Sequence, residues 1–111
     1  MIQIKDGVSI KIFRSDMLKM LLIVDEVWAE HAKGIYPVIT SYFRSQAMLH
    51  SFDKAIDLRT KNLTDEQKDK VYTALREALF ADGYDVILEY RGQAEEHIHI
   101  EYDPKPGRGI A

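Results

Sequence analysis

The sequence predicts an α+β fold in which a small, mostly antiparallel sheet carries two main helices on one face. Several short segments alternate between apolar and polar residues, and two longer segments repeat apolar residues at helical spacing. The 111 residues, of which 46% are hydrophobic, suffice for one core and are too few for two ordinary domains. We therefore expect one domain over residues 1–103 and an extended tail over residues 104–111.

The first 13 residues alternate in hydrophobicity around Asp6 and Gly7, which predicts a β-hairpin. A two-residue turn would set Ile4 opposite Ser9. A three-residue loop with Gly7 in the left-handed conformation would pair Ile4 with Val8. We favour the second register because it brings apolar residues together.

Two amphipathic helices follow from the apolar spacing. The first is expected to begin at Ser15 as N-cap and to run to about Gly34, and the second opens with a capping box formed by Thr64 and Gln67. Gly83 is a suitable C-cap for the second helix. The expected core stripes consist of Met17, Met20, Leu21, Val24, Val27 and Trp28 in the first helix, and Val71, Leu75, Ala78 and Leu79 in the second.

Four further segments have strand character, namely residues 36–44, 55–59, 84–90 and 97–102, and residues 45–50 have the character of a loop. In the second segment, alternation sends Ile56 and Leu58 to one face and Asp57 to the other. In the last segment, Ile98 and Ile100 point to the core, whereas His97, His99 and Glu101 point away from it.

The polar faces of these two strands predict a metal site. If the strands are neighbours, Asp57 and His99 meet across the ladder, and His50 on the preceding loop supplies a third ligand. The chain has no cysteine, so a metal must be held by histidine and carboxylate groups. Two imidazoles and one carboxylate suit a catalytic Zn²⁺ ion with an open position for water, which indicates hydrolysis.

Two other residues are candidates for the chemistry. Hydrolysis needs a base that takes a proton from water, and Glu96, three residues before His99, is the first candidate, with Glu95 as the alternative. Arg44, at the end of a strand, can polarise the scissile carbonyl or bind a terminal carboxylate. If Arg44 has no role in the chemistry, we expect it to form an ion pair on the surface. Arg59 and Glu101 point to the same face of their strands and are expected to form a cross-strand ion pair.

The run from His50 to Asp57, followed by the His97-Ile98-His99 strand, resembles the zinc D-alanyl-D-alanine carboxypeptidase and L-alanyl-D-glutamate endopeptidase family, which is related to lysostaphin-type enzymes and hedgehog signalling domains. The family pattern is Ser-x-His-x-x-Gly-x-Ala-x-Asp, an acid three residues before a second histidine, and an upstream Thr-Ser-x-x-Arg strand. The residues that match are His50, Ala55, Asp57, Glu96, His99, Thr40, Ser41 and Arg44.

This resemblance implies a hedgehog-like fold with His50, Asp57 and His99 as Zn²⁺ ligands and Glu96 as general base. By the same resemblance, Arg44 binds a carbonyl or carboxylate, and His97 lies behind the ligands or stabilises the transition state. Alternatively, His97 is an exposed strand residue with no role in the site. The implied substrate is a peptidoglycan stem peptide or a related peptide containing D-amino acids.

The sequence departs from the family pattern at two positions, because Met48 replaces its serine and Asp53 its glycine. Neither is a ligand, so the departures affect substrate preference and activity more than metal binding. A domain that keeps the zinc site as a binding or structural module is the alternative function.

Charge and the N-terminal sequence exclude other partners and suggest a location. A formal net charge of −3 without a dense basic cluster argues against nucleic acid as a partner. No segment has the length of a membrane span or the pattern of a secretory signal. We therefore expect no membrane partner, and we expect synthesis in a cytoplasm. A phage-encoded enzyme, released or carried in a virion, and an intracellular recycling enzyme both suit this pattern. The oligomeric state does not follow from the sequence.

Overall fold

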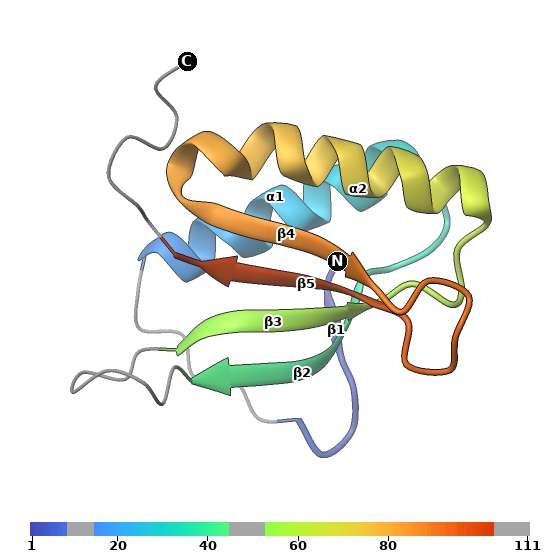
Figure 1. The fold of residues 1–111 in the computed structure, drawn as a ribbon, viewed down its shortest axis with the longest axis horizontal. Helices are drawn as coiled ribbons and strands as arrows, with labels where there is room; N and C mark the ends of the chain where they lie inside the picture. Colours follow the sequence, from blue (N-terminus) through green and yellow to red (C-terminus); the bar gives the residue numbers. More distant parts are fainter. Residues whose placement is uncertain (9–14, 45–52, 104–111) are drawn as a thin grey trace.

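A computed structural model describes residues 1–8, 15–44 and 53–103 of the chain (Figure 1). Its sheet has five strands in the order β1-β2-β3-β5-β4. β1 pairs with β2 in parallel, and the other neighbours are antiparallel, which confirms the α+β class and the mostly antiparallel sheet. The strands are β1 (Gln3–Ile4), β2 (Val38–Arg44), β3 (Asp53–Arg59), β4 (Tyr84–Glu89) and β5 (His97–Tyr102).

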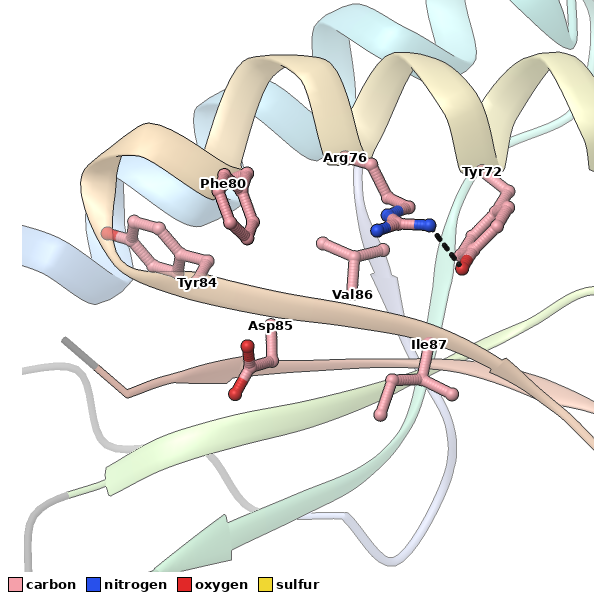
Figure 2. A pocket seen from close by; sticks show the side chains of 7 residues that line it. All are labelled: Tyr72, Arg76, Phe80, Tyr84, Asp85, Val86 and Ile87. Atoms are coloured by element: carbon pink, nitrogen blue, oxygen red, sulfur yellow. Dashed lines mark hydrogen bonds between the residues drawn. The ribbon is translucent and has the colours of Figure 1, made fainter. Parts of the chain in front are cut away.

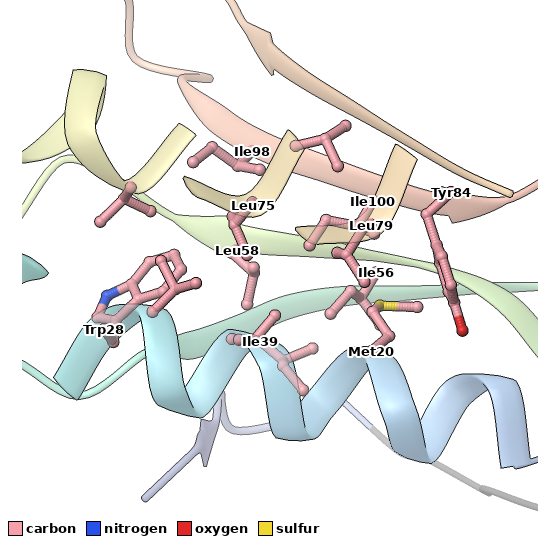
Figure 3. Close-up of a cluster of buried hydrophobic side chains, with 14 of the residues drawn as sticks. Met20, Trp28, Ile39, Ile56, Leu58, Leu75, Leu79, Tyr84, Ile98 and Ile100 are labelled. Atoms are coloured by element: carbon pink, nitrogen blue, oxygen red, sulfur yellow. The ribbon is translucent and has the colours of Figure 1, made fainter. Parts of the chain in front are cut away.

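Two helices, α1 (Ser15–His31) and α2 (Asp65–Leu79), cover one face of this sheet (Figure 1). Between them and the strands lies one cluster of buried apolar side chains (Figure 3). Trp28 from α1, Leu75 from α2 and Ile98 from β5 are each at most 1% exposed. The helices therefore leave the opposite face of the sheet free for polar side chains.

The second helix begins as its capping box predicts. Thr64 accepts a hydrogen bond from the backbone N–H of Gln67, whose side chain accepts one from the backbone N–H of Thr64. The predicted stripe is correct except at Ala78, which is exposed because Val71, Leu75 and Leu79 already form the buried row at spacings of four residues. After α2 the chain continues as the 3₁₀ turn η1 (Phe80–Asp82), and Gly83, with φ of 95°, ends that turn.

The N-terminal segment differs in part from the predicted hairpin. Gly7 has φ of 84°, and the backbone N–H of Val8 donates to the carbonyl of Lys5, so a turn does form at Asp6 and Gly7. In the described part of the chain, however, β1 pairs with β2 only. The other half of the predicted hairpin falls on residues 9–14, which lie outside the described residues, as do the predicted loop 45–50 and tail 104–111.

None of the described helices combines the length and the apolar character that crossing a bilayer demands.

Candidate metal centre

The centre of the polar face is formed by β3 and β5, which are neighbours in the sheet. Their register pairs Asp57 with His99, flanked by the pairs Ile56 with Ile100 and Leu58 with Ile98. These four apolar side chains are 0% exposed on the helix side. Alternation along each strand therefore projects Asp57, His97 and His99 to the other face.

Asp57, His97 and His99 form a compact group of potential ligands. Nδ1 of His99 lies 2.7 Å from Oδ1 of Asp57, and Nε2 of His97 lies 3.6 Å from the same oxygen. One ligand atom from each residue lies within 4.8 Å of those of the other two. Ligands of a tetrahedral zinc ion are about 3.3 Å apart, given bonds of about 2.0–2.1 Å. The three ligand atoms are therefore close enough together to hold one metal ion after adjustment of their side chains.

The environment of His99 favours positive charge. Nδ1 of His99 donates a hydrogen bond to Asp57, and Nε2 lies 3.5 Å from Oε1 of Glu101. The hydrogen bond to Asp57 raises the pKa of His99 above its usual value of 6.5, and partial burial opposes this without cancelling it. Without a metal, a protonated His99 balances the charge of Asp57, which is only 8% exposed.

His97 takes a more central place than the sequence indicated. Its Nδ1 lies 2.6 Å from the backbone carbonyl of Glu95 and therefore donates to it. This contact turns Nε2 toward the carboxylates of Glu89, at 3.3 Å, and Asp57. A backbone carbonyl that fixes one ring nitrogen is a common support for a metal-binding histidine, so His97 can serve as a ligand.

Two predicted site residues lie partly or wholly outside the described structure. His50, the predicted third ligand, is not among the described residues, so its role stays a prediction. Arg44 is the last residue of β2, and its backbone lies opposite Asp53. Ser41, from the same upstream motif, lies opposite Asp57, which places β2 beside the ligand group.

Glu96, the predicted general base, has a buried carboxylate that is bonded on both oxygens. Lys68 from α2 lies 2.9 Å from one oxygen and 3.0 Å from the other. The Thr60 hydroxyl donates at 2.6 Å and the Gly92 backbone N–H at 2.8 Å. Burial disfavours the charge of Glu96, but these donors outweigh it and lower its pKa from 4.5 to about 2.

These contacts give Glu96 a structural role that the sequence did not indicate. They join the end of β3, the start of α2 and the loop before β5, and Arg91 adds an ion pair from that loop to Asp69 of α2 at 2.6 Å. A carboxylate with this pKa is a weak proton acceptor, so a catalytic role for Glu96 requires that it first leave Lys68. Such a role stays a prediction.

A depression of about 290 Å³ lies beside the ligand group on the polar face. Asp57, His97 and Glu96 contribute to its wall, together with Thr40 and Ser41 of the upstream motif. The remaining lining residues are Lys5, Arg59, Lys61, Ala94 and Glu95.

Another depression, of about 210 Å³, lies between α2 and the edge strand β4 (Figure 2). Its cation, Arg76, donates to the Tyr72 hydroxyl at 3.2 Å and lies 5.5 Å from the centre of the Tyr72 ring. None of the three clustered ligands lines this depression, so we place the candidate chemistry on the polar face of the sheet.

Comparison of the chain with protein families, with curated proteins and with solved structures finds no match. The family resemblance stays an inference from the motifs alone.

We expect Asp57 to control the titration of His99. In metal-free protein, NMR titration of the imidazole should place the pKa of His99 above 6.5, and Asp57→Asn should lower it more than Glu101→Gln, because the Asp57 contact is shorter. The contact between Asp57 and protonated His99 contributes fully to the free energy of unfolding below pH 6.5. This contribution is lost as the pH rises through the pKa of His99 in the folded state. A His99 that titrates at or below 6.5 in the unmodified chain contradicts the described geometry.

We expect the ion pair between Lys68 and Glu96 to stabilise the fold. Lys68→Met leaves a buried carboxylate with one charge partner fewer and should lower the free energy of unfolding by about 3 kcal/mol at pH 7. The matched control is Lys70→Met, which removes an exposed pair with Glu66 on the same helix and should cost less than about 1 kcal/mol. Urea denaturation measures both.

The pH dependence of the same variants gives a second check. Because folding lowers the pKa of Glu96, the stabilisation is present above pH 4.5 and is lost as the pH falls toward 2. The difference between the unmodified chain and Lys68→Met should therefore shrink over that range. Equal stability losses for the Lys68 and Lys70 variants would show that Glu96 is not held in this way.

Proposed function

We propose that this chain is a zinc-dependent peptidase that hydrolyses a peptide bond in bacterial cell-wall stem peptides. The observation that carries the proposal is the contact between Asp57 and His99 across β3 and β5, with His97 within reach of the same carboxylate. The motif order around this group, and its resemblance to zinc carboxypeptidases and endopeptidases, supply the substrate class.

The donor set supports zinc among the divalent metals. Imidazole nitrogen and carboxylate oxygen are common zinc ligands, whereas Mg²⁺ and Ca²⁺ prefer oxygen ligands throughout. Asp57 and His99 would hold the ion, with His50 or His97 as the third ligand. Zinc in such a site acidifies water and polarises a carbonyl group.

The other groups of the chain would bind and orient the peptide. Thr40 and Ser41 line the depression beside the ligands. Ser41 offers its hydroxyl group to a peptide backbone, whereas the Thr40 hydroxyl donates to the backbone carbonyl of Asp57 at 3.4 Å and can still accept a hydrogen bond. We assign the polarising or carboxylate-binding cation to Arg44, as the resemblance implies. Glu96 is the general base of this proposal only if substrate binding releases it from Lys68, and Glu95, exposed on the same rim, is the alternative.

A second function, a zinc-bearing domain that binds a partner without catalysis, is favoured by the contacts of Glu96. A carboxylate held by Lys68, Thr60 and Gly92 serves the fold and leaves the site without a free base at that position. The metal group would then order the surface that a partner contacts.

Metal removal tests the proposal. The protein should cleave a stem pentapeptide, L-alanyl-γ-D-glutamyl-L-lysyl-D-alanyl-D-alanine, or intact peptidoglycan, with products identified by mass spectrometry. A chelator should abolish cleavage, and one equivalent of Zn²⁺ should restore it. Asp57→Asn should lose both zinc and activity, because it exchanges a charged ligand for a neutral amide.

The matched control is Asp82→Asn, which changes an exposed ion pair with Lys19 on the helix side and should keep both zinc and activity. A zinc-loaded protein that cuts no stem peptide supports the non-catalytic alternative. A protein that binds no zinc contradicts both functions.

A further inference from the structure

Three cations line the depression beside the ligand group. Lys5 follows β1, where its backbone N–H donates to the carbonyl of Ile39 at 2.9 Å, while Arg59 ends β3 and Lys61 follows two residues later. All three side chains are exposed. They come from two separate parts of the chain, and the sheet brings them to one rim.

Arg59 does not form the ion pair with Glu101 that the sequence predicted. The register sets Arg59 opposite His97 and sets Glu101 opposite Ala55, so the predicted ion pair between Arg59 and Glu101 is wrong. Glu101 approaches His99 instead. Within the described residues, Arg59, Lys5 and Lys61 make no ion pair.

The anions of this depression are mostly neutralised by other partners. Asp57 contacts His99, and Glu96 contacts Lys68. Glu95 is the remaining carboxylate in the lining, against the three cations on the rim. A bound metal ion would add further positive charge, so the depression attracts anions although the whole chain has a net charge of −3.

We propose that Lys5, Arg59 and Lys61 form a subsite for a free carboxylate of the substrate peptide. The inference rests on the proposed peptidase function, and it names a specificity that the metal group does not supply. Asp57 and Arg59 are two residues apart on one strand face, or about 6.6 Å, which equals two residues of an extended peptide. We therefore expect the recognised carboxylate to lie near the scissile bond.

The chemistry of the rim favours a carboxylate over a neutral polar group. The planar guanidinium of Arg59 can donate two parallel hydrogen bonds to a carboxylate, and the two ammonium groups add charge that is less dependent on direction. An amidated side chain would have to expose its own donors to these cations. The site should therefore discriminate between free and amidated forms of the same peptide.

Binding of three forms of one tripeptide tests the subsite without requiring turnover. The probe is L-alanyl-γ-D-glutamyl-L-lysine with both carboxylates amidated, with only the D-glutamyl carboxylate free, or with only the C-terminal carboxylate free. Zinc-loaded and zinc-free protein are titrated with each form and followed by NMR. One of the free forms should bind about five- to tenfold more tightly than the doubly amidated form.

Variants of the rim cations test whether these residues cause the preference for the free carboxylate. Arg59→Gln should reduce the preference to less than about twofold, and Lys61→Gln should reduce it partly. The matched control, Lys33→Gln, removes the same charge from an exposed lysine that lines a depression beside Trp28 and should leave the preference unchanged.

Equal binding of the three forms, or a preference that survives in Arg59→Gln, overturns the inference. Because the titration measures binding, a protein that discriminates but never cleaves a peptide would refute the peptidase function and retain the subsite. A protein that cleaves all three forms equally well would refute the subsite and retain the peptidase.

Discussion

The antiparallel register of β3 and β5 is the constraint on which the rest of the site depends. It places Asp57 opposite His99 on one face and buries Ile56, Leu58, Ile98 and Ile100 on the other. A slip of one residue in either strand would turn its apolar side chains to water, at about 1.5–3 kcal/mol for each. The hydrophobic core therefore fixes the position of the ligands, although none of the ligands belongs to it.

The start of β5 is held by a second, electrostatic contact. Glu96 precedes His97 directly, and its carboxylate is bound by Lys68, Thr60 and Gly92. This contact joins the helix layer to the loop before β5, and the carbonyl of Glu95 in that loop orients the His97 ring. Glu96, the general base predicted from the motif, thus also fixes the position of β5, which carries the potential ligands His97 and His99. The two candidate functions therefore differ mainly in Glu96: the peptidase requires it to leave Lys68, whereas the binding domain keeps this contact.

Local patterns predicted the features that depend on local geometry. Alternation within residues 55–59 and 97–102 was enough to place Asp57 and His99 on one face, because a strand has a fixed period of two. The partners of Glu96 could not be predicted, since Thr60 and Lys68 are 36 and 28 residues away and no spacing rule connects them. Alternation also placed Arg59 and Glu101 on one face and so allowed an ion pair between them, but the register of β3 and β5 sets them apart. The parallel pairing of β1 with β2 likewise required knowledge of the tertiary arrangement.

The proposed function requires that Asp57 and His99 hold one metal ion on the open face of the sheet. A crystal structure of the zinc-loaded protein, with anomalous diffraction recorded on both sides of the zinc absorption edge, can locate that ion. We expect one strong anomalous peak about 2.0–2.2 Å from a carboxylate oxygen of Asp57 and from a ring nitrogen of His99. A peak bound elsewhere, or no peak at this pair at full zinc loading, would rule out the proposed metal site.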